Sequence, residues 1–206
     1  MTAQSFTICP TGGGVGAFVE GLDLTGEISA ETTEGLKRSL GEHGVLFFRQ
    51  QHLSPEQHIA FAQGFAPINI NRFFTPVDGH PAIAEVCKEP DHNRNIGGFW
   101  HTDHTYDDEP AMGSILLAKE VPGSGGDTIF ANMYSAYDTL SEGLKETLGT
   151  MRAVHSSRHA FGAQTHYHKE ANGRFHNPEA ATQDVVHPVI ITHPISGRKA
   201  LYVNRA

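Results

Sequence analysis

The stretch FWHTDHT, residues 99–105, mixes aromatic, β-branched and polar side chains and predicts a β-strand. Side chains two positions apart on a strand project from the same face. His101 and Asp103 are therefore expected to project together, and Thr102 and His104 the other way. Two histidines and one carboxylate with open positions are typical of non-haem Fe(II) oxygenases. A hydrogen-bonded pair without metal is the alternative, because short His-x-Asp sequences are common by chance.

Two helices are expected before this stretch. Residues 29–41 carry Leu36 and Leu40 on one face and end at a glycine. The second helix begins with SPEQ, where Ser54 caps, a proline takes the first helical position and a glutamine completes a capping box. An apolar run between the two helices, HGVLFFRQ, predicts a buried strand.

Short strands are expected along the rest of the chain, separated in part by turns rich in glycine, proline and serine. Their predicted ranges are 83–87, 98–104, 114–120, 127–131, 151–156, 185–193 and 199–204. One or two helical segments open at Ser135 and Ser141. This pattern predicts a mostly β fold with helical decoration, a sandwich or jelly roll, in a single domain over residues 1–206.

Composition limits the kinds of partner. The 206 residues carry a formal net charge of −8 with neutral histidines, so no basic field favours a nucleic acid. No apolar run is long enough to span a membrane, and no signal peptide is visible, so a cytoplasmic protein is expected. The two cysteines are far apart and form no CxxC pair. The 14 histidines favour a metal only slightly. Whether the chain forms a homo-oligomer stays open.

Longer motifs resemble one enzyme family. The segment GGFWHTDHTYDDEPAMGSILLAKEVPGSGGDTIFANMYSAYDTLSEGLKETL joins a W-H-x-D motif to a later G-G-D-T motif. Further pieces are EHGVLFFRQQHLSPEQHIAFAQGF, MRAVHSS and VHPVIITHPISGRKALYVN. Together they resemble the taurine dioxygenase and 2,4-dichlorophenoxyacetate dioxygenase (TauD/TfdA) family, from about residue 8 to the last residue.

The resemblance implies a double-stranded β-helix (jelly roll, cupin-like) and an oxygenase that needs Fe(II) and 2-oxoglutarate. His101 and Asp103 would be catalytic residues and two of the iron ligands. Thr128, in GGDT, would bind the distal carboxylate of 2-oxoglutarate, and Trp100 would pack beside the metal strand. The reaction would consume 2-oxoglutarate and O₂, release succinate and CO₂, and hydroxylate a small, anionic substrate of the sulfonate or aryloxyacetate type.

The resemblance also implies groups that this sequence does not supply. In the family, the second histidine ligand and the arginine that binds 2-oxoglutarate lie farther downstream than the final LYVNRA. We therefore expect a C-terminally incomplete copy of a longer enzyme, lacking its last strands and marginal or inactive alone. None of the histidines after Asp103 matches the pattern of the distal ligand: His155, His159, His166, His168, His176, His187 and His193. His187 and His193 begin His-Pro turns, where capping or surface roles are expected.

Four residues are candidates for substrate contact. His104 and Tyr106 follow the metal motif at positions that resemble substrate-pocket sites of the family. Arg72, in NINRFF, could supply positive charge, and Phe161, in SSRHAFG, an apolar wall. Because Gly97 stands where taurine-specific relatives have an asparagine, taurine itself is a weak candidate.

Three other functions compete with the oxygenase. A metallo-hydrolase would need a histidine where Phe99 stands, and the glycines of TGGGVGAF lack the lysine of a P-loop. Both are therefore weak candidates. A degenerate, metal-free member acting as a binding module is the more serious alternative, although His101, Asp103 and Thr128 are all present.

Overall fold

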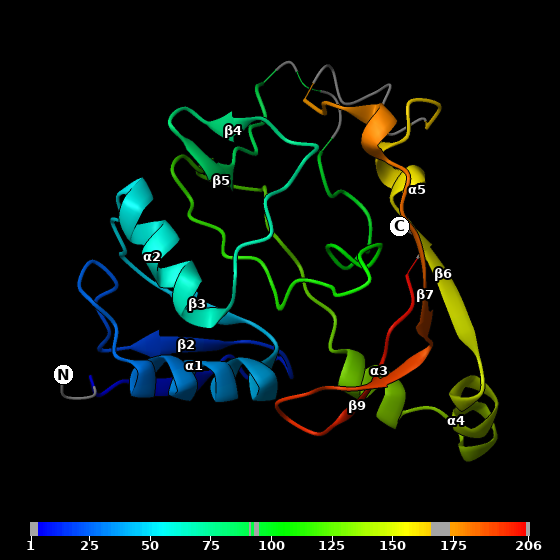
Figure 1. Ribbon diagram of the computed structural model, residues 1–206. Helices are drawn as coiled ribbons and strands as arrows, with labels where there is room; N and C mark the ends of the chain where they lie inside the picture. Colours follow the sequence, from blue (N-terminus) through cyan, green and yellow to red (C-terminus); the bar gives the residue numbers. More distant parts are fainter. Residues whose placement is uncertain (1–3, 91, 93–94, 166–173, 205–206) are drawn as a thin grey trace. The chain divides into compact units, whose positions relative to one another are not determined.

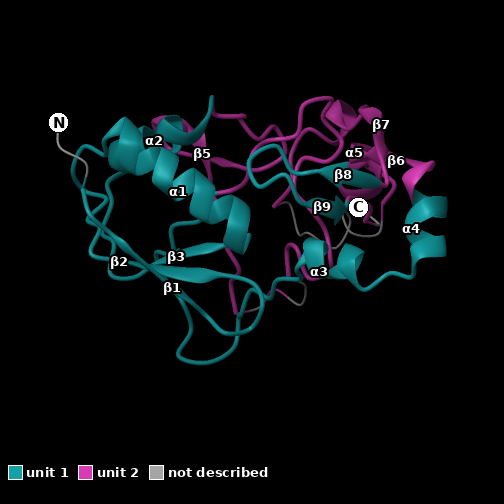
Figure 2. Cartoon of the chain, turned by 90° about the horizontal axis from the view of Figure 1, so that it is seen from below, with its two compact units in different colours: residues 1–67, 115–148, 190–201 teal, residues 68–114, 149–189, 202–206 magenta. Residues whose placement is uncertain are grey.

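The computed structural model describes residues 4–90, 92, 95–165 and 174–204 (Figure 1). The chain divides into two compact units, each built from three separate segments (Figure 2). Unit 1 comprises Met1–Pro67, Ile115–Leu148 and Ile190–Leu201. Unit 2 comprises Ile68–Ser114, Gly149–Val189 and Tyr202–Ala206. The single catalytic-type domain expected over residues 1–206 stays a prediction.

Unit 1 contains a three-stranded sheet in the order β1-β2-β3. Strand β1 (Thr7–Pro10) runs antiparallel to β2 (Ala17–Glu20), and β2 runs parallel to β3 (Leu46–Phe48). Two parallel neighbours need a crossover connection, and helix α1 (Ala30–His43) provides it.

The two helices expected in the first third of the chain are confirmed. Ser29 caps α1 by accepting from the backbone N–H of Thr32, and the helix ends at Gly44 in the left-handed conformation. Helix α2 (Pro55–Phe65) begins with the complete capping box of Ser54 and Gln57. These contacts satisfy backbone N–H groups that have no partner within the helix.

The core of unit 1 joins this sheet to its helices. Leu36 of α1 is fully buried, and Phe61 of α2 meets Phe48 of β3 edge-on with ring centroids 5.7 Å apart. The buried cluster consists of Val19, Leu22, Leu24, Leu36, Leu53 and Phe61.

The later segments of unit 1 are short elements. They are α3 (Met133–Asp138), α4 (Glu142–Gly149, whose last residue belongs to unit 2) and the antiparallel pair β8 (Ile190–Thr192) and β9 (Lys199–Leu201). Tyr134 of α3 donates its hydroxyl to the carbonyl of Gly41 at 2.8 Å, which ties α3 to the end of α1.

The described residues of unit 2 form two antiparallel ribbons and two short helices. The ribbons are β4 (Pro76–Val77) with β5 (His80–Ala84), and β6 (Arg152–Ser156) with β7 (Asp184–Pro188). The helices are α5 (Ser157–Phe161) and the 3₁₀ turn η1 (Pro178–Ala180). A second buried cluster forms around Phe73, Tyr106 and Ala181.

The strand predictions are confirmed in part. Strand β6 matches the predicted range 151–156, β7 and β8 divide the range 185–193, and β9 covers the first half of 199–204. The ranges 98–104, 114–120 and 127–131 were wrong, because the structure assigns them turns and irregular backbone. A strand needs a hydrogen-bonded neighbour, and no described segment pairs with these three. Most of their large apolar side chains are exposed, as at Leu116 (77%) and Ile129 (69%), whereas Leu117 packs against the buried cluster of unit 1.

Candidate metal centre

The predicted metal pair converges in unit 2. Nε2 of His101 lies 3.3 Å from Oδ1 of Asp103. The backbone that achieves this is not a strand: residues 99–102 are irregular, and residues 103–106 form a turn. The prediction that both side chains project together is therefore confirmed, although a turn and not strand alternation brings them together.

Gly97 makes room for the imidazole. Its φ is 69°, in the left-handed region that favours glycine. A Cβ added there would lie 3.1 Å from Cε1 of His101, closer than an ordinary van der Waals contact. The glycine thus lets the backbone approach the ring.

Two outer contacts orient the pair. The Nδ1–H of His101 donates to the carbonyl of Phe99 at 2.7 Å, which leaves Nε2 on the side of Asp103. The Ser114 hydroxyl donates to Oδ2 of Asp103 at 2.7 Å, so Oδ1 is the oxygen that faces the imidazole. Metal-binding histidines and carboxylates commonly have such partners, which fix the tautomer and the ring orientation.

Each member of the pair shifts the other's titration. The hydrogen bond with Asp103 raises the pKa of His101, and burial works against this shift. The hydrogen bond with His101 lowers the pKa of Asp103, and burial works against this shift as well. A metal ligand must be deprotonated, so a cation here competes with the proton shared by the pair.

The geometry fits two neighbouring ligands of one ion. Adjacent ligands of an octahedral ion with bonds of about 2.1 Å lie about 3 Å apart, close to the observed separation. A nitrogen and a carboxylate oxygen also suit Fe(II). Within the described ranges, no group of three or more His, Cys, Asp or Glu side chains could hold a metal. His101 and Asp103 thus supply two donors.

Asp107 is the centre of a polar cluster four residues after Asp103. Its Oδ1 accepts from Nη2 of Arg72 at 2.9 Å, and its Oδ2 accepts from Nδ2 of Asn69 and Nδ1 of His104, both at 3.0 Å. Its backbone N–H donates to the carbonyl of His104 at 3.1 Å. The predicted substrate residues Arg72 and His104 therefore both contact one carboxylate.

Tyr106 and Phe161 belong to the aromatic core of unit 2. Phe161 stacks on Phe73 with ring centroids 4.1 Å apart and planes 8° apart, and Tyr106 meets Phe161 edge-on at 6.0 Å. Burial raises the pKa of Tyr106, and the carboxylate of Asp107 adds to that shift. The two rings contact each other, while the contact of either residue with a substrate stays a prediction.

Two other residues of the motifs are exposed. Thr128 is an exposed residue of unit 1 without regular secondary structure, and its contact with 2-oxoglutarate stays a prediction. Trp100 was expected to pack beside the metal strand, and this was wrong, since the residue is 59% exposed.

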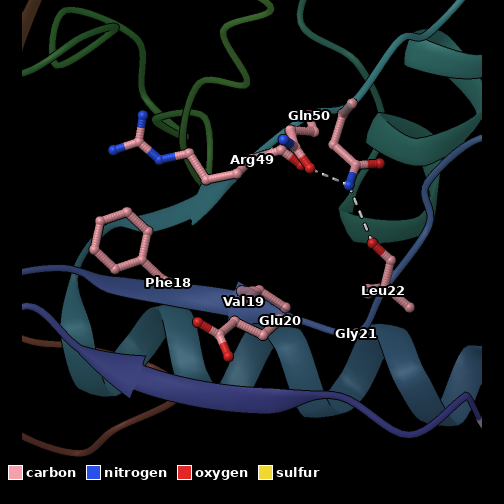
Figure 3. A pocket seen from close by; sticks show the side chains of 8 residues that line it. Phe18, Val19, Glu20, Gly21, Leu22, Arg49 and Gln50 are labelled. Atoms are coloured by element: carbon pink, nitrogen blue, oxygen red, sulfur yellow. Dashed lines mark hydrogen bonds between the residues drawn. The ribbon is translucent and has the colours of Figure 1, made fainter.

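Two pockets are lined by other residues. The first, of about 440 Å³, is in unit 1 where β2 and β3 end (Figure 3). There Gln51 donates to the carbonyls of Leu22 and Arg49, both at 3.1 Å, and the guanidinium of Arg49 lies 5.1 Å from the ring centroid of Phe18. The second, of about 410 Å³, is in unit 2 and is lined by Arg158, Gly162, Ala163, Gln164, Thr165, Pro178 and Ala181. No predicted site residue lines either pocket.

The downstream histidines have other contacts. Nε2 of His187 donates to the carbonyl of Asp107 at 3.1 Å. Nδ1 of His193 accepts from the backbone N–H groups of Ile195 and Ser196, so the predicted capping role is confirmed. His176 lies 2.6 Å from the hydroxyl of Thr75. His166 and His168 lie outside the described residues.

Sequence reasoning missed Ser114, Asn69 and Asp107. Ser114 is 11 residues from Asp103, and Asn69 is 38 residues from Asp107. No strand or helix periodicity joins residues at such separations, so only the backbone path of the loops could identify them.

No described helix is both long enough and apolar enough to cross a membrane.

Comparisons with known proteins agree with the motifs. An alkylsulfatase from Acinetobacter baylyi is 34% identical over 92% of this chain and 60% of its own length. An alpha-ketoglutarate-dependent sulfate ester dioxygenase from Pseudomonas putida is 31% identical over 97% of this chain and 66% of its own. The crystal structure of a taurine dioxygenase from Burkholderia xenovorans superposes with a TM-score of 0.73 at 30% identity, covering 96% of this chain and 62% of that one.

The chain thus spans 60 to 66% of the length of the two curated relatives. The profile of the family "Taurine catabolism dioxygenase TauD, TfdA family" matches residues 7–206. This match confirms the resemblance that the W-H-x-D and G-G-D-T motifs indicated. The chain belongs to the taurine catabolism dioxygenase TauD, TfdA family.

Proposed function

We propose that the protein is an Fe(II)- and 2-oxoglutarate-dependent dioxygenase. The observation that carries this proposal is the convergence of His101 Nε2 and Asp103 Oδ1 at 3.3 Å in a member of the TauD, TfdA family. The similarity to the structure of a taurine dioxygenase supports a double-stranded β-helix as the proposed architecture.

His101 and Asp103 would hold the iron as catalytic ligands. Iron bound there, with 2-oxoglutarate and O₂, supplies the oxidising power that hydroxylates the substrate and releases succinate and CO₂. The carbonyl of Phe99 keeps the imidazole in the tautomer that leaves Nε2 unprotonated for the metal, and the hydroxyl of Ser114 orients the carboxylate. Thr128 would donate its hydroxyl to the distal carboxylate of 2-oxoglutarate.

The substrate would be a small organic anion of the sulfonate, sulfate ester or aryloxyacetate type. The names of the relatives support a sulfate ester. His104, Tyr106, Arg72 and Phe161 are the proposed substrate residues. In the substrate-free protein the charge of Arg72 is balanced by Asp107, so an anion that recruits this guanidinium must compete with that carboxylate.

Iron- and 2-oxoglutarate-dependent release of succinate tests the proposal. We expect any succinate release by residues 1–206 to be marginal and to require Fe(II), 2-oxoglutarate, O₂ and a substrate such as an alkyl sulfate together. Asp103→Asn should abolish it, and Asp108→Asn, an exposed neighbour of the same charge, should not. A protein that binds the organic anion without metal and without turnover would instead be the metal-free binding module.

A further inference from the structure

The turn that carries Asp103 is unusual at its second residue. His104 has a φ of 56°, in the left-handed region that residues with a side chain rarely adopt. A conformation of this kind persists only when surrounding contacts hold it. The next two residues, Thr105 and Tyr106, are buried at 1% and 7% exposure, so the turn is anchored on its far side.

Asp107 supplies the contacts that hold this turn. It forms two hydrogen bonds with His104: its backbone N–H donates to the carbonyl of His104, and its carboxylate accepts from Nδ1 of His104. The carbonyl of Asp107 accepts from Nε2 of His187, which belongs to strand β7. The position of the turn is therefore defined from both the backbone and the side chain of one residue.

The carboxylate is itself fixed from outside the turn. Asn69 and Arg72 donate to its two oxygens, and its side chain is only 14% exposed. Arg72 is held in turn, because the amide of Asn177 donates to its carbonyl at 2.9 Å. Partly buried hydrogen bonds to a charged group are stronger than exposed ion pairs, because water and salt screen them less.

We propose that Asp107 is a positioning residue of the metal site: its carboxylate, held by Asn69 and Arg72, fixes the turn 103–107 and so keeps Asp103 facing His101. The inference rests on the proposed metal site and goes beyond it, because Asp107 does not touch the metal pair. Loss of the carboxylate frees His104 to leave its left-handed conformation. Since His104 is bonded directly to Asp103, the ligand then loses its fixed direction.

Mn(II) affinity measured by electron paramagnetic resonance provides a readout that does not depend on turnover. Asp107→Asn keeps the shape of the side chain and removes its charge, and we expect the dissociation constant for Mn(II) to rise about 10-fold, the lower end of the loss typical when a direct partner of a metal ligand is removed. The matched control is Asp108→Asn, directly after the turn, whose side chain is exposed. Its dissociation constant should equal that of the unchanged protein.

A second control separates positioning from general stability. Asp184→Asn breaks the contacts of Asp184 with Ser156 and Arg158, elsewhere in unit 2. We expect it to lower the melting temperature without changing the dissociation constant for Mn(II). If Asp107→Asn behaves in the same way, the carboxylate only stabilises the fold and the inference is wrong.

Arg72→Gln provides a double-mutant cycle and a second route if Asp107→Asn fails to fold. Both substitutions break the same contact, the one between Arg72 and Asp107. The double variant should therefore bind Mn(II) no more weakly than the weaker-binding single variant. Additive losses, or an unchanged affinity in Arg72→Gln, would overturn the inference. Absence of Mn(II) binding by the unchanged protein would contradict the proposed function itself, and the inference with it.

Discussion

Ser114 donates its hydroxyl to Oδ2 of Asp103 at 2.7 Å, and this bond turns the other oxygen of the carboxylate toward His101. The two residues are 11 positions apart, so a loop closes on the metal turn. The orientation of the carboxylate is thus a property of the loop as well as of the motif.

Ser114→Ala should weaken the metal site without removing a ligand. We expect the dissociation constant for Mn(II) to rise about 10-fold, because outer partners of metal ligands typically contribute 10- to 100-fold in affinity. Electron paramagnetic resonance titration measures it. Ser124→Ala, at another exposed serine, is the control and should leave the affinity unchanged. Equal affinities in both variants would show that the Ser114 bond has no role in metal binding.

Thr128→Val tests the predicted contact with 2-oxoglutarate. Losing a hydrogen bond to a charged group costs about 1.5–3 kcal/mol, which corresponds to at least about a 10-fold rise in the KM for 2-oxoglutarate. Thr128→Ser keeps the hydroxyl and should restore most of the affinity. A KM that does not change in Thr128→Val would remove this residue from the cofactor site.

Leu36 and Leu144 offer a matched pair for the core of unit 1. Leu36 is fully buried in α1, and Leu144 is 50% exposed in α4. Leu36→Ala should lower the free energy of unfolding by about 2–5 kcal/mol, because it leaves a cavity. Leu144→Ala should change it by less than about 0.5 kcal/mol. Denaturant titration compares the two variants, and a similar loss in both would contradict the described core.

Stability should fall on mild acidification because of His155. Burial lowers the pKa of this residue, the nearby His187 lowers it further, and the backbone of Tyr202 opposes the shift. Below about pH 6.5 the unfolded chain takes up a proton that the folded chain does not. The free energy of unfolding therefore falls as the pH drops through this window, by at most about 1.4 kcal/mol per pH unit from this group.

Denaturant titrations between pH 5 and 8 would measure this slope. His155→Phe removes the titrating group from its place beside the rings of His187 and Tyr202 and should flatten the slope. His159→Gln, at an exposed histidine, should keep it. Burial also lowers the pKa of His58 and His193, so a residual slope of the same sign is expected in His155→Phe. An unchanged slope in His155→Phe would contradict the assignment.

The helices could be predicted because their determinants are local. Ser29, Ser54 and Gln57 cap backbone groups within a few residues of their own position, so a short window of sequence contains the whole signal. The predicted strands 114–120 and 127–131 failed for the opposite reason. A strand is defined by its neighbour, and an apolar run such as the one around Leu116 does not say which segment pairs with it.

The candidate site shows the same division. His101 and Asp103 are two residues apart, so their common direction could be predicted, although a turn produces it. The residues that orient them were not predictable. Arg72 and Asp107 are 35 residues apart in the sequence. Their contact depends on the packing of unit 2 and not on any local pattern.

The central claim is that His101 and Asp103 bind one ferrous ion, which anaerobic Fe(II) titration in the presence of 2-oxoglutarate tests most directly. We expect a visible charge-transfer band in the unchanged protein and in Asp108→Asn, and its loss in both His101→Gln and Asp103→Asn. An undiminished band in either ligand variant, or no band in the unchanged protein, would contradict the claim.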